Sequence, residues 1–217
     1  MFERYFARQL AQPSGWFGKW YLARWFRKHT RAVNQMVLAN LAARPGDRLL
    51  EIGFGGGDLL QAILTGQALA HVVGIDHSMA MVDQTRKRLR RFILKEQVEI
   101  ACASVEEIPY PSGHFTRIVS VNTLYFWPDP ALALAECRRV LGAGGQFILC
   151  FDAKEDLERW PGHVFGFRLY DPEEVESLFR AAQFEGIDRV THSLPGYGKV
   201  HCLTAQVAMT QASRITG

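Results

Sequence analysis

From residue 46 onward, short apolar runs alternate along the chain with amphipathic stretches. The apolar runs predict strands at 47–53, 71–76, 98–104, 115–122 and 146–152. Helical spacing of apolar residues predicts helices at 57–66, 78–93 and 131–141, the last stopped by glycines. Buried strands separated by helices form parallel βαβ units. We therefore predict an α/β fold with a doubly wound sheet that is covered on both faces.

The pattern changes in the last third of the chain. Residues 171–184 predict a helix opened by Asp171 and Pro172, because proline suits the first turn and acids favour the positive end of the helix dipole. Two β-like runs follow at 186–194 and 199–209, joined by a short loop that suits an antiparallel hairpin. Together with the five preceding runs, they predict a mostly parallel seven-stranded sheet with an antiparallel C-terminal hairpin.

The first 45 residues differ in charge from the rest, with eight Lys or Arg and one acid in a chain whose net charge is only +3. On a helix, the large aromatic residues of 15–31 fall at i, i+4 spacing with basic residues around them. We expect a helical cap over 1–45 and a Rossmann-like domain over 46–217. The cap helix could pack as a cover over an active site, act as a lid for a bulky apolar or anionic acceptor, or make weak contact through residues 14–31 with an anionic membrane surface.

Composition narrows the class of protein. The chain lacks a run of about eighteen apolar residues, and charges interrupt its N-terminal apolar residues, so we expect neither a membrane-spanning helix nor a secretory signal. The four cysteines have no metal-ligand spacing and are expected to be reduced thiols, with no metal bound. A net charge of +3 gives no reason to expect a nucleic-acid partner. We expect a soluble cytoplasmic protein.

A glycine-rich turn, LLEIGFGGGDLL at 49–60, links the first strand to a helix. Such a turn lets a nucleotide approach the backbone closely. A dinucleotide fingerprint would require glycine at position 58, but Asp58 stands there and would repel a pyrophosphate. Glu51 before the turn suits a ligand with a cationic end, and Asp76 after the second strand can accept ribose hydroxyls, as in NAD sites and other adenosine sites. An adenosine cofactor is predicted, and an NAD(P)-dependent oxidoreductase remains the alternative.

Several ordered motifs share one family resemblance. They are E-x-G-x-G-x-G at Glu51, Gly53, Gly55 and Gly57, G-x-D-x-S-x-x-M at Gly74, Asp76, Ser78 and Met81, ASVEEIPY at 103–110, NTLYFWPDP at 122–130, and E-x-x-R-V-L-x-x-G-G at 136–145. The set resembles the class I methyltransferases that use S-adenosylmethionine, of the small-molecule type and similar to the ubiquinone and menaquinone biosynthesis group. The resemblance implies that S-adenosyl-L-methionine is the cofactor and S-adenosyl-L-homocysteine the product.

The resemblance also implies a set of cofactor-binding residues. The methionine end would lie at Glu51 and the backbone of Gly53, Phe54, Gly55 and Gly57, the ribose at Asp76, the adenine at His77, Ser104 and Val105, and the sulfonium near Asn122. One departure is Ser104, where relatives often have an aspartate that bonds the adenine amino group.

Methyl transfer is an in-line displacement that requires the acceptor atom and the methyl group to be aligned and water to be excluded, rather than a metal. The aromatic side chains of Tyr125, Phe126 and Trp127 could wall a small or lipid-like acceptor, or could instead anchor the loop in the core. If the acceptor keeps its proton, Tyr125 and His29 are the candidate bases. A membrane-peripheral protein that binds the cofactor without methyltransferase activity is the remaining alternative.

Overall fold

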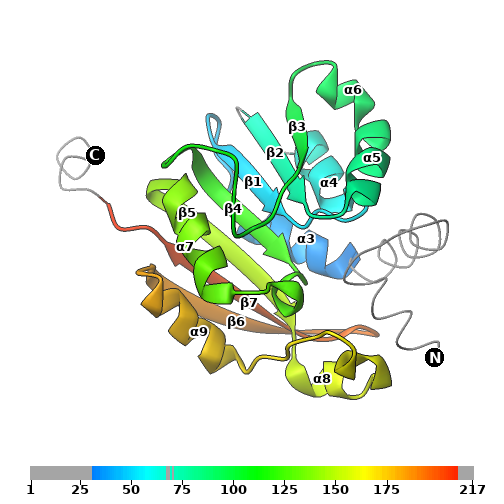
Figure 1. The fold of residues 1–217 in the computed structure, drawn as a ribbon, viewed down its shortest axis with the longest axis vertical. Helices are drawn as coiled ribbons and strands as arrows, with labels where there is room; N and C mark the ends of the chain where they lie inside the picture. The colour runs from blue at the N-terminus through cyan, green and yellow to red at the C-terminus, as the bar shows by residue number, and fades with distance from the viewer. Residues whose placement is uncertain (1–30, 67–68, 70, 210–217) are drawn as a thin grey trace.

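The computed structural model describes residues 31–66, 69 and 71–209. Its strands are β1 (Arg48–Ile52), β2 (His71–Asp76), β3 (Val98–Cys102), β4 (Phe115–Val121), β5 (Leu141–Asp152), β6 (Glu185–Leu194) and β7 (Gly198–Gln206). They form one seven-stranded sheet in the order β3-β2-β1-β4-β5-β7-β6 (Figure 1). Strands β1 to β5 are mutually parallel, and β7 is antiparallel to both β5 and β6. The predicted mostly parallel sheet with an antiparallel C-terminal hairpin is confirmed.

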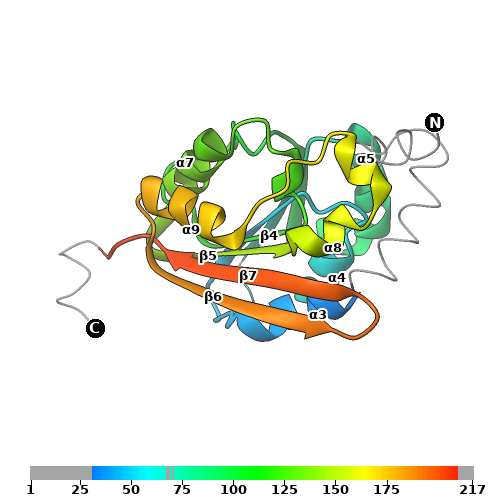
Figure 2. The same ribbon diagram turned by 90° about the horizontal axis from the view of Figure 1, so that it is seen from below.

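Helices cover both faces of this sheet. The described helices are α3 (Arg31–Asn40), α4 (Asp58–Gly66), α5 (Met79–Arg88), α6 (Arg90–Ile93), α7 (Pro130–Val140), α8 (Lys154–Glu158) and α9 (Pro172–Ala181), with 3-10 turns η2 (Leu124–Phe126) and η3 (Pro161–Val164). Helices α7 and α9 lie on one face and α3 and α4 on the other (Figure 2). Strand side chains alternate accordingly: Leu50 and Ile52 share a core cluster with α7 and α9, and Leu49 shares one with α3, α4 and α5. The fold is doubly wound, as predicted.

Three local features differ from the expected elements. The helix predicted at 78–93 is divided at Leu89 into α5 and α6. Strand β5 begins at Leu141, directly after α7, so its first residues include the glycines expected to form a separate break. The segment between β5 and α9, where no element was expected, contains α8 and η3. These short helices lie near the carboxyl end of β5, where they help to form the site described below.

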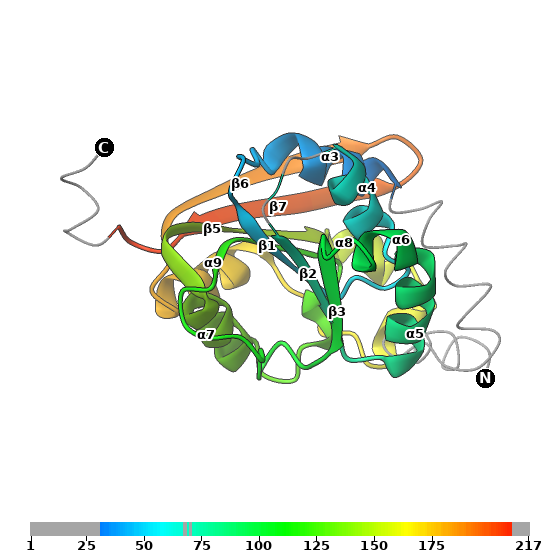
Figure 3. The same ribbon diagram turned by 90° about the horizontal axis from the view of Figure 1, so that it is seen from above.

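Residues 31–45 are the described part of the predicted N-terminal cap, and α3 is the helix within them. Val33 and Val37 of α3, and Leu41 just after it, are fully buried in the core cluster shared with α4. Figure 3 shows α3 beside α4. The division of the chain at residue 45 stays a prediction. Residues 1–30 of the cap lie outside the described residues. They include His29 and, apart from Arg31, the membrane contact suggested for residues 14–31. Among the helices described, none is long and apolar enough to cross a membrane.

Candidate active site

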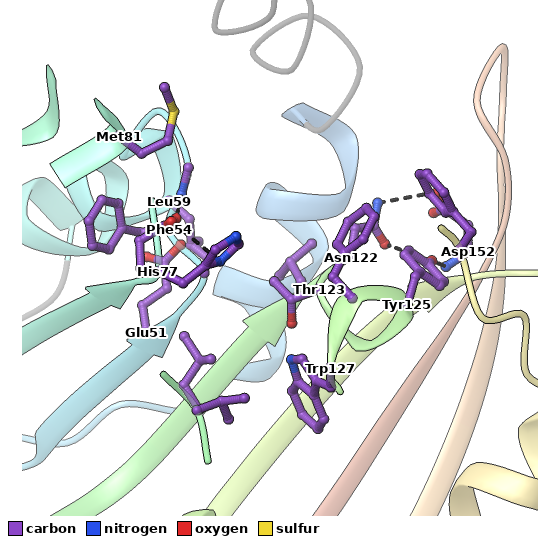
Figure 4. Close-up of a pocket in the computed structure, with 18 of the residues that line it drawn as sticks. Glu51, Phe54, Leu59, His77, Met81, Asn122, Thr123, Tyr125, Trp127 and Asp152 are labelled. Atoms are coloured by element: carbon purple, nitrogen blue, oxygen red, sulfur yellow. Dashed lines mark hydrogen bonds and ion pairs between the residues drawn. The ribbon is translucent and has the colours of Figure 1, made fainter. Parts of the chain in front are cut away.

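The site lies where the order of the strands reverses. From β1 the chain proceeds to β2 and β3 on one side of the sheet, and later to β4 and β5 on the other side. The connections that leave the carboxyl ends of β1 and β4 therefore run in opposite directions, with a crevice between them. Open α/β sheets bind ligands at this switch point. A cavity of about 640 Å³ is located there, within the size range of small-molecule and cofactor sites. In Figure 4, Glu51, Phe54 and His77 lie toward one end of it, and Asn122, Tyr125 and Asp152 toward the other.

The glycines of the first turn have separate roles. Gly53, Gly55 and Gly57 have φ values of +71°, +49° and +72°, a region that favours glycine. A Cβ on Gly53 would lie 2.3 Å from Thr123 Cγ2, and one on Gly57 would lie 2.7 Å from Thr85 Cγ2. A Cβ on Gly55 would meet nothing within 4 Å, although Gly55 lines the cavity. Gly53 and Gly57 thus permit close packing inside the protein, whereas Gly55, whose N–H and carbonyl oxygen are bonded to Asp76 and Thr85, leaves open space at its Cα on the cavity wall. Gly57 does not line the cavity.

Asp76, at the end of β2, holds the glycine turn in place. Its Oδ2 accepts a hydrogen bond from Gly55 N at 2.9 Å, and its Oδ1 accepts one from Ser78 N at 2.8 Å. Burial raises the pKa of Asp76, and the two backbone donors act in the opposite direction. Ser78 occupies the N-cap position of α5 as predicted, but its side chain makes no capping bond. Because each carboxylate oxygen has two acceptor sites, Asp76 on the cavity wall can still accept from a ligand hydroxyl.

Glu51 is a buried carboxyl group at the end of β1 on the cavity wall. Only 4% of the residue is exposed, and no hydrogen-bond donor among the described residues reaches its Oε2. Burial, with repulsion from Asp76 and Asp58, raises its pKa to about 8, although a hydrogen bond from the Leu60 backbone acts to lower it. A buried acceptor that lacks a donor is costly and uncommon. The orphaned oxygen therefore fits a ligand that brings its own cationic donor, such as an ammonium group.

Asp58, the first residue of α4, does not stand as an isolated negative charge. Its Oδ1 lies 2.6 Å from Nη2 of Arg88, whose Nη1 also donates to Gly56 O at 2.7 Å. This pairing partly offsets the repulsion of a pyrophosphate that the sequence suggested for Asp58. The preference for a cationic ligand end consequently rests on Glu51. Arg88, which ties α5 to the glycine turn, was not predicted, since it belongs to a basic run that resembles a solvated helix face.

The residues expected around adenine also lie at this end of the cavity. His77, Ser104 and Val105 all line it. The His77 side chain is half exposed, with Nδ1 3.9 Å from Asp76 Oδ1. Ser104 Oγ accepts a hydrogen bond from Glu106 N at 3.2 Å, so this hydroxyl is used within its own turn. The structure thus brings Glu51, Phe54, Asp76 and these three residues to one site.

Four polar residues form a network at the other end. Asn122, with a φ of +55°, donates from Nδ2 to Tyr197 Oη at 2.8 Å and to Asp152 Oδ2 at 3.3 Å. Tyr197 Oη donates to Asp152 Oδ1 at 2.9 Å. Tyr125 Oη donates to Asn122 Oδ1 at 3.3 Å and accepts from the backbone N–H of Asp152. Sequence reasoning missed Asp152 and Tyr197. An acid at the end of the strand beside β4 was a usable signal for Asp152, whereas the PGYGK loop carried none for Tyr197.

The structure argues against Tyr125 as the base suggested from the sequence. Burial, with the nearby Asp152 carboxylate, raises the pKa of Tyr125 well above its usual range. The phenol therefore stays protonated near neutral pH, and its oxygen is engaged with Asn122 and the Asp152 backbone. Tyr125 serves as a hydrogen-bonding residue of the network. The other candidate base, His29, lies outside the described residues.

Apolar side chains surround this polar network. Phe126 and Phe167 pack edge to face with ring centroids 4.7 Å apart, and Trp160 meets Phe167 in the same manner at 5.4 Å. Trp127 is 6% exposed and belongs to the core cluster, yet it also lines the cavity. Both interpretations of the aromatic loop, as a core anchor and as a cavity wall, therefore hold. The α8–η3 segment supplies Leu157 and Trp160 to the same wall. Within the described ranges, no group of three or more His, Cys, Asp or Glu side chains could hold a metal ion.

Comparison with known proteins gives a consistent family. Residues 50–149 match the model of a methyltransferase domain. The chain is 29% identical over 159 residues to the uncharacterized methyltransferase YdaC of Bacillus subtilis, covering 73% of this chain and 82% of YdaC. It is 26% identical to a demethylmenaquinone methyltransferase of Symbiobacterium thermophilum, over 77% of this chain and 61% of that one. A structure of an S-adenosylmethionine-dependent methyltransferase from Aquifex aeolicus superposes with a TM-score of 0.69 at 20% identity, covering 94% of this chain and 98% of that one. These findings support a class I S-adenosylmethionine-dependent methyltransferase, with the methyltransferase domain over residues 50–149.

Proposed function

We propose that the protein transfers a methyl group from S-adenosylmethionine, bound across the glycine turn, to a small or lipid-like acceptor at the aromatic end of the cavity. The observation that carries this proposal is the buried Oε2 of Glu51, which has no hydrogen-bond donor among the described residues and belongs to the cavity wall beside the glycine turn. The α-ammonium group of the cofactor would supply the missing donor. Bound there, the cofactor supplies an electrophilic methyl group.

The residues of the first end would bind and orient this cofactor. Glu51 would hold the ammonium, Asp76 the ribose hydroxyls, and the backbone of Gly53, Phe54 and Gly55 the methionine chain. His77 and the short Ser104–Val105 segment would contact adenine, with Asn122 toward the reacting sulfur. Such residues lower the barrier by positioning rather than by covalent chemistry, because an in-line displacement depends on alignment.

The acceptor class follows from the other end of the cavity. Around the polar network its wall is formed by aromatic and aliphatic side chains, which favour an apolar or aromatic body. A relative named for demethylmenaquinone supports a lipid-like acceptor as well. The nicotinamide alternative has no support among these relatives. A membrane-peripheral role without catalysis depended on the N-terminal helix and stays a prediction.

Titration calorimetry of the full chain with S-adenosylmethionine, S-adenosylhomocysteine and NAD tests the cofactor. We expect the first two to bind and NAD not to bind, and the reverse pattern would contradict the proposal. Transfer of a labelled methyl group into small molecules from a cell extract, followed by partition between water and an organic solvent, tests the acceptor class. We expect label in the organic phase, and label confined to water would rule out an apolar acceptor.

A further inference from the structure

Asp152 is a carboxyl group at the acceptor end that the cofactor does not require. We infer that Asp152 is the proton acceptor for a hydroxyl group on an aromatic acceptor, which makes the substrate a phenol-type compound. This inference rests on the proposed function and specifies its acceptor. It is drawn from the position of Asp152 on the cavity wall, the hydrogen bonds that orient it, and the aromatic side chains around it.

The network fixes the direction of the Asp152 carboxylate. Tyr197 Oη donates to Oδ1 and Asn122 Nδ2 donates to Oδ2, so both oxygens are held by side chains that come from other loops. Each oxygen keeps a second acceptor site. Asp152 lies at the end of the cavity opposite Glu51, with Trp127 and Thr123 between them in Figure 4. A planar aromatic body against Phe167 and Trp127 would place its hydroxyl near this carboxylate.

The surroundings make Asp152 a suitable base near neutral pH. Burial raises its pKa to about 6, and repulsion from Asp156 on α8 adds to this, whereas the bonds from Tyr197 and Asn122 lower it. Titratable groups around Asp152 in the described chain include Tyr125 and Tyr197, whose pKa values burial raises so that both phenols stay protonated. They also include the Cys150 thiol on β5, whose pKa is raised by its hydrogen bond to Cys202 and by burial. The nearby Lys199 is paired with Glu155 at 3.1 Å. Above pH 6 Asp152 is thus largely ionised, and a base with a pKa close to the working pH is effective.

The chemical step balances with Asp152 as the only proton acceptor. The hydroxyl oxygen of the acceptor forms a bond to the methyl carbon while the methyl–sulfur bond breaks and its electron pair stays on sulfur. The hydroxyl proton passes to Asp152 Oδ, and the neutral carboxyl group later releases it to water. The products are an aryl methyl ether and a thioether, and no oxidant or metal is needed.

A pair of matched probes tests this inference without turnover. We would measure by calorimetry the binding of 2-naphthol and of 2-methoxynaphthalene to the full chain saturated with S-adenosylhomocysteine, at pH 7.5 and pH 5.0. Only 2-naphthol can donate a hydrogen bond to the carboxylate. Because charge-assisted hydrogen bonds are the stronger ones, we expect it to bind roughly tenfold more tightly than its ether at pH 7.5, and this preference to fall severalfold at pH 5.0.

Asp152→Asn should reduce the preference and remove its pH dependence while binding S-adenosylhomocysteine as the wild type does. Glu158→Gln, a change of an exposed carboxylate at the end of α8, should behave as the wild type. A preference that survives unchanged in Asp152→Asn, or that does not vary with pH in the wild type, would overturn the inference, as would failure of both probes to bind. Failure of S-adenosylhomocysteine to bind would instead overturn the proposed cofactor function.

Discussion

Replacing Glu51 by glutamine should weaken cofactor binding and at the same time stabilise the free protein. The carboxyl group is buried at the end of β1 with a pKa of about 8, so near neutral pH it is mostly protonated before the ligand arrives. An ammonium group at its orphaned oxygen would require the ionised form. Glutamine imitates the protonated carboxyl in shape and cannot become the charged partner. The variant should therefore fold, and its defect should appear on binding.

The size of both effects can be derived from the pKa. One pH unit corresponds to about 1.4 kcal/mol, so wild-type affinity for S-adenosylhomocysteine should rise nearly tenfold per unit between pH 6.0 and pH 7.5 as Glu51 ionises more easily. Removing one partner of a buried charge pair costs roughly 2 kcal/mol or more, which is the loss expected for Glu51→Gln at pH 7.5. Affinity of the variant should change little with pH across this window, so the two proteins should converge toward pH 6.0.

Glu51→Gln should raise the free energy of unfolding of the free protein, although it lowers the affinity for the cofactor. The folded-state pKa of Glu51 lies above its ordinary value of 4.5, so its contribution to the stability of the free protein is complete below pH 4.5 and is lost as pH rises through about 8. Glu51→Gln avoids this loss, and at pH 7.5 it should stabilise the free protein by up to about 4 kcal/mol, since three pH units separate that pH from the ordinary value.

Calorimetric titration with S-adenosylhomocysteine at several pH values, together with urea unfolding of the free protein, measures both quantities. Glu185→Gln, a change of an exposed carboxylate at the start of β6, is the matched control and should resemble the wild type in both assays. If Glu51→Gln bound the ligand as tightly as the wild type, with the same pH dependence, Glu51 would not hold the ammonium group and the orientation of the cofactor would have to be reversed.

Three further changes test other parts of the site. Gly55→Ala should weaken S-adenosylhomocysteine binding at least tenfold in calorimetry but lower the free energy of unfolding by only about 1 kcal/mol, because the positive φ disfavours alanine while the added Cβ meets no protein atom. Gly53→Ala should instead lower the thermal unfolding midpoint strongly, because its Cβ would clash with Thr123. Equal effects of the two glycine changes on stability would contradict this assignment. Asp76→Ala should weaken the same binding by roughly 1–3 kcal/mol, since ribose donors and two backbone N–H groups lose their acceptor, and an unchanged dissociation constant would show that the ribose lies elsewhere. Tyr125→Phe should lower the free energy of unfolding by about 1 kcal/mol but leave the pH dependence of methyl transfer unaltered, because the phenol is no base, and a shifted pH profile would contradict that.

Strands β1 to β5 were predictable because each contains a short apolar run bounded by glycine or polar residues, and a buried parallel strand requires such a run. The break at Leu89 was not predictable, since apolar spacing continues across RLRRFI from α5 into α6. Strand β5 starts early for a tertiary reason: Leu141 pairs with Phe115 before the register shifts to Arg117 opposite Gln146. The glycines after Leu141, which the local sequence pattern predicts as the end of a helix and a loop, belong to β5 because the strand pairs with β4.

The cofactor end of the candidate site was also predictable from the sequence, whereas the acceptor end was not. Glu51, Asp76 and the glycines of 53–57 lie at or just after the ends of strands, so their position in one site could be inferred from the order of elements along the chain. The acceptor end depends on Tyr197 reaching Asp152 across 45 residues of sequence, and no local pattern encodes that contact. Likewise, the absence of a donor at Glu51 Oε2 is a property of the packed structure, because it depends on every neighbour at once.

A crystal structure of the full chain with bound S-adenosylhomocysteine tests the central claim most directly. We predict that the amino group of the ligand lies within hydrogen-bond distance of Glu51 Oε2, that its ribose hydroxyls reach Asp76, and that its sulfur faces the Asn122 and Asp152 end of the cavity. A ligand seated with its adenine at Glu51, or located outside this cavity, would contradict the account.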